Sequence, residues 1–380
     1  MNKKGKKFNP KRFKEARIVR GFSIKELADE IGVTRQAVSQ YQIGETTPKQ
    51  ETMFRIINVL NFPKSFFYRN YEEDFVGNTF FRANATATKK SKETQYHKTL
   101  LAGYIYEYLS KHIEFPEINL PDVSFFNDDW DNDSIEELAT MVRKSWGIDD
   151  NPISNIIHLL EKNGIMVFSV DTESKKVDAF AQHRKSVPFV FVGNDKKSFF
   201  RRQFDAAHEL GHILMHKDID NQDLLTREEF KVMENQANKF ASAFLLPKFA
   251  FKKTITSTSL LHFIELKKYW YVSMAAMIYR SYDLGIIDER RYTSLQKQIS
   301  MKKYRRREPL DDVYPVKKPT VLRRSIEMLL EHEVKNELEI INEISLPKDL
   351  IEMLCDLEEG TLNYSSPKPS LRLLKGKDNR

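Results

Sequence analysis

His208 and His212 flank Glu209 in the pattern H-E-x-x-H, which restricts the local fold more than any other feature of this chain. The pattern lies in a stretch, 199–216, whose apolar residues recur at intervals of three and four, which predicts a helix. Two histidines four apart on a helix project in nearly the same direction, so both rings can reach one zinc ion. The glutamate between them is then placed to act as a base toward water. The pattern therefore predicts a hydrolytic zinc site.

The alternative is an ordinary surface helix that happens to carry two histidines. A chain of this length would show H-E-x-x-H by chance on the order of one time in a hundred. An apolar stripe at steps of four, three, four and three argues against this, because it gives the helix a buried face: Phe200, Phe204, Ala207, Gly211 and Leu214. Gly211 costs about 1 kcal/mol relative to alanine in mid-helix, so we expect another element to approach it closely.

A catalytic zinc ion needs a third protein ligand. Glu229 follows Thr226 by three residues, which is a capping box that starts a new helix and gives Glu229 a structural role. Glu234 lies three residues before Ala237 on the apolar face of that helix, where a metal ion would offset the cost of burying a carboxylate. We expect Glu234 to be the third ligand, with Glu228 as second choice. The alternative for Glu234 is a pairing with lysine or arginine at the edge of the core.

Other candidate ligands are excluded by spacing and composition. His216 lies four residues after His212, but three histidines along one straight helix cannot converge on one ion. We expect His216 to support the site or the helix end. Cys355 is the one cysteine of the chain, which excludes internal disulfides and fits a reducing cytoplasm. A zinc ion here must therefore use histidine and carboxylate ligands.

These residues resemble the ImmA/IrrE family of bacterial metallopeptidases. The similarity spans about 134–305 and is carried by several separated motifs in the same order, chiefly at 201–216, 234–241 and 244–247. The resemblance implies an intracellular, site-specific endopeptidase that typically cleaves a transcriptional repressor. By position in the motif it assigns the same residues: His208, His212 and Glu234 as zinc ligands and Glu209 as general base.

The N-terminal part predicts a helix-turn-helix unit. Ser23 starts one helix, Gly32 makes a turn and Thr34 caps a second helix. The second helix of such a unit enters the major groove of DNA, where arginine recognises guanine and glutamine recognises adenine. We therefore expect double-stranded DNA to be a partner, bound by the polar face of this helix: Thr34, Arg35, Gln36, Ser39 and Gln40.

Residues 8–67 resemble the XRE, or lambda-repressor-like, family, whose members form a five-helix domain. The sequence departs from the family at Gln42, where glutamate is common, and this position does not touch the reading face. The alternative is a domain of the same fold that binds a protein through that face.

The charge balance is consistent with an acidic partner. The chain has 61 Lys and Arg against 54 Asp and Glu, a net charge of +7, although ordinary solvation can give the same excess. No apolar run approaches the roughly 18 residues of a membrane span, and the basic start is not followed by the apolar core of a signal peptide. We therefore expect a cytoplasmic protein with no membrane partner.

We expect an α+β, predominantly helical chain. Its predicted parts are a helix-turn-helix domain at 1–70, a linker and connecting helix at 71–133, a zincin-like peptidase domain at 134–305, helices of unknown role at 306–364 and a disordered tail at 365–380. Three short strands, 165–170, 177–181 and 189–192, predict a small sheet before the zinc helix.

Three segments carry more detailed expectations. The polar and basic run at 84–99 predicts a solvated linker, with a connecting helix from about Tyr96 to His112. Ser134 and Glu137 predict a capping box at the start of a helix. Apolar periodicity from about Thr320 to Ile344 predicts one long amphipathic helix.

Together these parts give two main hypotheses. The first is a DNA-binding zinc endopeptidase that regulates transcription by site-specific cleavage of a repressor or related regulator. The second is a transcription regulator whose peptidase-like domain senses a partner or ligand without cleavage. A third is autoproteolysis within 84–99, and the sequence leaves open whether the chain forms a homodimer.

Overall fold

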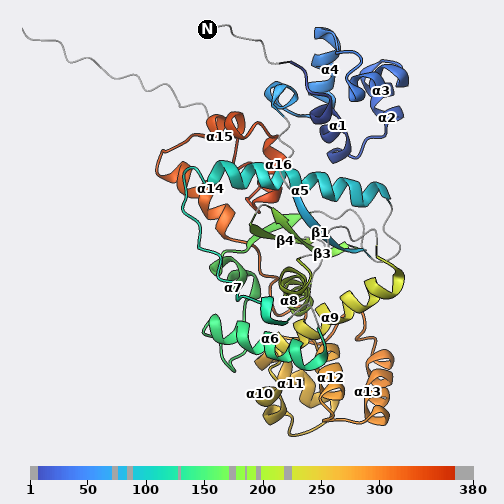
Figure 1. Cartoon of the computed structure of the whole chain (residues 1–380), viewed down its shortest axis with the longest axis vertical. Helices are drawn as coiled ribbons and strands as arrows, with labels where there is room; N and C mark the ends of the chain where they lie inside the picture. Colours follow the sequence, from blue (N-terminus) through green and yellow to red (C-terminus); the bar gives the residue numbers. More distant parts are fainter. Residues whose placement is uncertain are drawn as a thin grey trace, which may run out of the picture.

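The computed structural model describes residues 7–70, 76–83, 89–126, 130–170, 177–184, 186–193, 198–217 and 225–363. The tail predicted at 365–380 lies outside them. Helices surround a small sheet, with the helix-turn-helix region at one end of the molecule and a group of helices around α8 and α9 toward the other (Figure 1). The predicted fold class, α+β and predominantly helical, is confirmed.

The N-terminal domain is a compact set of short helices: α1 Pro10–Val19, α2 Ile24–Ile31, α3 Arg35–Ile43, α4 Gln50–Leu60 and the 3-10 helix η1 Lys64–Tyr68. Its boundaries follow local chemistry. Ser23 and Glu26 form a reciprocal capping box at the start of α2, and the Thr34 side chain accepts from Ala37 N in α3. Gly32 ends α2 with a φ of 64°, which favours glycine.

The sheet contains four strands in the order β1-β3-β4-β2: β1 Val76–Ala83, β2 Met166–Val170, β3 Val177–Arg184 and β4 Val187–Gly193. β3 pairs antiparallel with both β1 and β4, and β2 pairs parallel with β4. The three predicted strands are present. β1 was not predicted, because its pairing partner, β3, lies far away in the sequence.

The two faces of the sheet belong to different cores. Val167 and Val190 pack with the helices around α8 (Phe199–Met215), whereas Phe168 and Phe191 pack with α5 (Lys89–Leu109) and the C-terminal helices. Side chains alternate between faces along a strand, which explains how one short strand serves both cores. The helices on the α8 side are α6 Asn132–Ser145, α7 Ile156–Lys162, α8, α9 Arg227–Leu245, α10 Lys248–Thr254, α11 Leu260–Trp270, α12 Met274–Asp283 and α13 Glu289–Met301.

The start of α6 differs from the prediction. Asp131 caps this helix by accepting from Ser134 N at 2.8 Å, so the helix begins at Asn132 and not after Ser134. Aspartate is as good an N-cap as serine, and it stands one turn earlier. The predicted capping box of Thr226 and Glu229 is confirmed at α9.

Part of the segment 84–99, predicted as a solvated linker, is a partly buried helix in the structure. α5 begins at Lys89, and Gln95, Lys98 and Thr99 are buried. The helix is buried because it lies between the N-terminal domain and the sheet, where Thr94 Oγ1 donates to Ile18 O at 3.3 Å. The prediction from polar composition, that residues 94–99 are exposed to solvent, was therefore wrong.

The predicted helix from Thr320 to Ile344 is two helices, α14 Val321–Glu331 and α15 Glu337–Ile344, followed by α16 Lys348–Leu354. The break follows from local chemistry, because Asn336 and Glu339 form a capping box that starts α15 and Glu333 adopts a positive φ of 53°. Among the described residues, no helix has the length and apolar character needed to cross a membrane.

Candidate metal centre and nucleic-acid interface

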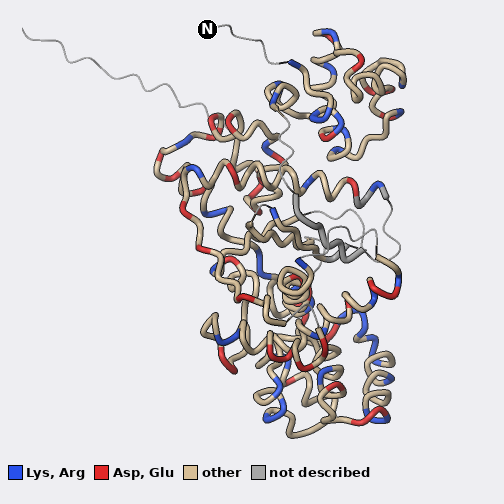
Figure 2. The backbone as a smooth tube through the Cα atoms, in the orientation of Figure 1, with Lys and Arg blue, Asp and Glu red and all other residues tan. Residues whose placement is uncertain are grey.

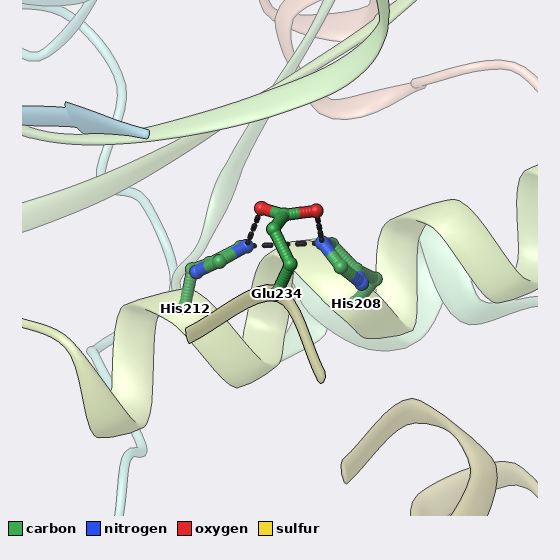
Figure 3. Close-up of side chains that lie close together, drawn as sticks. All are labelled: His208, His212 and Glu234. Carbon is green, nitrogen blue, oxygen red and sulfur yellow. Dashed lines mark hydrogen bonds and ion pairs between the residues drawn. The ribbon is translucent and has the colours of Figure 1, made fainter. Parts of the chain in front are cut away.

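Packing of α8 against α9 brings His208, His212 and Glu234 together (Figure 3). The Nε2 atoms of His208 and His212 lie 2.9 Å apart. Glu234 Oε2 lies 3.5 Å from His208 Nε2, and Glu234 Oε1 lies 3.2 Å from His212 Nε2. The three residues that the sequence predicted as ligands therefore converge from two helices on one point.

This geometry suits a small divalent ion. In a tetrahedral zinc site with bonds of about 2.0–2.1 Å, ligand atoms lie about 3.3–3.4 Å from one another. The measured separations of 2.9 to 3.5 Å lie around that value. Two neutral imidazoles and one carboxylate are also a donor set that leaves room for water at a fourth position.

Gly211 allows the close approach of the two helices. A Cβ at this position would lie 3.3 Å from the Ala237 Cα and 3.1 Å from Phe240 Cδ1, which is tighter than nearly all such contacts. The predicted reason for a glycine in mid-helix is therefore confirmed. The close approach also places Glu234, one turn before Ala237, against the histidines of α8.

A chain of hydrogen bonds fixes the proton on His212. The Trp130 carbonyl can only accept, so Gln236 donates to it through Nε2 at 3.2 Å and uses Oε1 toward His216 Nε2 at 3.0 Å. A neutral His216 then donates from Nε2 and accepts at Nδ1, which lies 2.9 Å from His212 Nδ1. His212 consequently carries its proton on Nδ1, and Nε2 is the unprotonated nitrogen that a metal ion requires.

The charge states of the site agree with this assignment. Burial and the neighbouring His212 lower the pKa of His216 to about 3, so its ring stays neutral. Burial alone would raise the pKa of Glu234, but hydrogen bonds from and charge interactions with protonated His208 and His212 outweigh that effect and hold the pKa below its usual value, so positive charge at this point keeps Glu234 ionised. Glu234 is therefore an ionised carboxylate, as a metal ligand must be.

His208 is oriented by a different partner. Its Nδ1 lies 3.0 Å from Asn238 Oδ1, so His208 donates there and leaves Nε2 in the unprotonated form. The sequence predicted no role for Asn238 or Gln236. The spacing could have predicted a role for Asn238. This residue lies four residues after Glu234 and hence on the same side of α9, one turn later.

The remaining carboxylates separate into two groups. Glu209 is completely buried on α8, directly after His208 and three residues before His212. Glu228, the second choice for the third ligand, is exposed in the first turn of α9 and does not belong to the cluster. Glu229 caps α9 through Thr226. Of the predicted alternatives, only Glu234 reaches the histidines.

Of the predicted DNA-reading residues, four lie on α3 and Thr34 is the N-cap of this helix. Val38 and Tyr41 are buried in the domain core, and the opposite face of the helix lies at the periphery of the molecule, away from the sheet and the metal centre (Figure 1). Thr34, Arg35 and Gln36 are exposed, and Ser39 and Gln40 are half-buried. Nothing among the described residues therefore covers the first turn of α3.

Comparison with known proteins agrees with both parts of the molecule. Residues 160–282 match the family model of the IrrE N-terminal-like domain, and residues 13–67 match the helix-turn-helix model. The chain thus joins a helix-turn-helix domain to an IrrE N-terminal-like domain. The two matched segments include α3, the zinc-type motif and all three converging residues.

Two individual proteins are similar to parts of the chain. It is 31% identical over 64 residues to the SPbeta prophage-derived uncharacterized HTH-type transcriptional regulator YonR of Bacillus subtilis. That match covers 17% of this chain and 59% of the relative. A solved structure of a Mycobacterium tuberculosis transcriptional regulator aligns at 21% identity with a TM-score of 0.30, over 41% of this chain and 49% of that one, which is too weak to bear on function.

Proposed function

We propose that this protein is a DNA-binding zinc endopeptidase that regulates transcription by site-specific cleavage of a repressor or related regulator. The observation that carries the proposal is the convergence of His208, His212 and Glu234 with the proton of each ring held on Nδ1. This arrangement directs the unprotonated Nε2 atoms of both histidines and the Glu234 carboxylate to one point. It is the arrangement that a zinc ion needs.

The chain's own residues supply the rest of the chemistry. A zinc ion held by these ligands would polarise a peptide carbonyl and make water acidic enough to lose a proton near neutral pH. Glu209 accepts the proton of the attacking water and returns it to the nitrogen of the leaving amine.

We propose that the substrate binds at an edge of the sheet. β1 is an edge strand and pairs with β3, which packs against α8. An extended peptide can add to such an edge through main-chain hydrogen bonds, which orient the scissile carbonyl independently of side chains.

Glu209→Gln tests whether cleavage is the function. The variant keeps the shape of Glu209 but cannot take up a proton, so we expect bound zinc and DNA binding to be retained and cleavage of the regulator to be lost. The leading substrate candidate is a small repressor encoded beside this gene, co-expressed with wild type or variant and followed by its size. The matched control is Glu228→Gln, an exposed position outside the cluster, which should cleave like wild type.

A second function has an observation in its favour. His208, Glu209 and His212 are buried in the described structure, as they would be in a domain that senses a partner or ligand without cutting. In that case a reporter gene under the protein's control would respond equally to wild type and to Glu209→Gln. Loss of the response in the variant, with DNA binding intact, supports the peptidase.

Autoproteolysis within 84–99 is the least favoured reading. Residues 89–99 belong to α5, and Gln95, Lys98 and Thr99 are buried, so this part is not an extended and accessible substrate. Mixing tagged wild type with the Glu209→Gln chain should leave both sizes unchanged.

A further inference from the structure

A basic groove lies where the N-terminal domain meets the first turns of α5. It has a volume of about 500 Å³ and is lined on one side by the α1–α2 turn and the start of α2 and α3. The other side is formed by α5 residues from outside the helix-turn-helix domain. Lysines and arginines gather at this end of α5 and on the neighbouring helices (Figure 2). The cationic side chains that line the groove are Arg17, Lys25, Arg35 and Lys90.

The first turns of α5 are held firmly against the N-terminal domain. Thr94 lies on α5 one turn after Lys90, and its hydroxyl donates to the Ile18 carbonyl. Further along α5, the Tyr104 hydroxyl accepts a hydrogen bond from Arg12. Arg12 is itself buried, with its guanidinium 4.4 Å from the centre of the Tyr104 ring. These two contacts join α5 to the N-terminal domain, beside which Lys90 and Arg35 line the same groove.

The groove has an excess of available positive charge. Lys25, Arg35 and Lys90 are all exposed. The acidic side chain that lines the groove, Glu93, has its own partner in Lys14 at 3.8 Å. Glu26, which stands nearby, is engaged in the capping box with Ser23.

The charges at the groove also act on Glu26. Its pKa is lowered first by the hydrogen bond from the Ser23 backbone and further by the charges of Lys90 and Lys25. Lys90 therefore lies within electrostatic reach of the start of α2. An exposed cationic groove at the edge of the α3 face is complementary to a polyanion.

We propose that this groove takes a phosphodiester segment of duplex DNA next to the base pairs that α3 reads, and that Lys90 supplies a backbone contact from outside the helix-turn-helix domain. The proposal rests on the DNA binding proposed above. It follows from continuity, because Arg35 belongs both to the reading face of α3 and to the groove. Phosphate contacts fix the register and orientation of a protein on DNA, so this contact would hold the peptidase part in a set position beside the duplex.

We test this by measuring how the affinity for DNA depends on salt concentration. This dependence reports the number of phosphate contacts, and it can be measured without knowing the DNA sequence that the protein recognises. Full-length protein is titrated against a labelled duplex of random sequence at several salt concentrations. Each lost phosphate contact reduces the slope of log K against log salt by about 0.9. The variants are Lys90→Gln, Lys90→Arg and the control Lys111→Gln, which removes an exposed lysine just past the opposite end of α5.

We expect Lys90→Gln to reduce the slope by about 0.9, and Lys90→Arg and Lys111→Gln to keep the wild-type slope. Equal slopes for Lys90→Gln and Lys111→Gln, with wild type bound to DNA, would overturn this inference and leave the proposed function intact. If wild type shows no binding to duplex DNA at low salt, the proposed DNA binding fails, and this inference fails with it.

Discussion

Each histidine of the candidate metal centre has the position of its ring proton determined by a different neighbour. His208 relies on Asn238, one side chain on the helix that also carries Glu234, whereas His212 relies on the longer chain through His216 and Gln236. The sequence could predict the three converging residues because two of them share a helix and the third stands on an apolar face. It could not predict the supporting residues, because their role depends on how α8 and α9 pack.

Asn238→Ala should weaken zinc binding by about 10- to 100-fold, because loss of a hydrogen bond that orients a metal-bound histidine has an effect of this size. The measurement is competition for zinc with a chelator of known affinity. Asn235→Ala is the matched control, since Asn235 is exposed on the same helix and should bind zinc like wild type. Equal affinities for the two variants would show that Asn238 does not orient His208.

At the scale of elements, capping residues predicted three helix starts correctly, and local signals failed where tertiary contacts decide. The caps Ser23, Thr34 and Thr226 each start the helix expected of them. The polar start of α5 was misread as solvated, because its burial comes from the helices packed around it and not from its own composition. β1 was missed for a related reason, since its pairing with β3 joins distant segments.

The burial of α5 predicts a pH dependence of stability. Burial, and then the charges of Lys14 and Arg17, lower the pKa of His97 from 6.5 to about 4. The unfolded chain therefore binds a proton between pH 6.5 and 4 that the folded chain does not. The stabilisation is complete above about pH 6.5 and is lost progressively as the pH falls toward 4, by up to about 3 kcal/mol.

Urea unfolding at several pH values checks this. His97→Gln removes the titrating ring, so the variant should lose less stability than wild type between pH 7 and 4.5. His332→Gln is the control, because His332 is exposed just after α14 and its removal should leave the wild-type profile. If the free energy of unfolding of His97→Gln depends on pH as it does in wild type, His97 does not contribute to the pH dependence.

At the scale of the whole molecule, the sheet and the C-terminal helices join the two functional parts. Arg20, the C-cap of α1, pairs with Asp349 of α16 at 2.6 Å, and Arg69 donates to the Ile344 carbonyl at 2.8 Å. The C-terminal helices, whose role the sequence left unknown, therefore contact the N-terminal domain and also pack on the sheet. No local pattern predicts contacts between segments so far apart, and the fold class was nevertheless predictable from the strand and helix patterns.

The segment between α13 and α14 depends on one buried cation. Lys267 is completely buried and contacts Glu308 at 2.9 Å and Asp311 at 2.7 Å. Lys267→Ala leaves two buried carboxylates without their cation, which should destabilise the protein by about 3–5 kcal/mol. Lys268→Ala is the matched control, because its pair with Glu265 is exposed and should contribute little. Similar thermal unfolding of both variants would contradict this account of the segment.

Elemental analysis of the purified protein tests whether His208, His212 and Glu234 bind a zinc ion. Wild type should contain one zinc ion per chain, and His208→Ala should contain almost none, because two ligands do not hold zinc firmly. The chain offers one cysteine, buried Cys355, so sulfur ligation cannot replace the lost histidine at this site. Wild type without zinc after purification in its presence, or equal zinc in wild type and His208→Ala, would contradict the account.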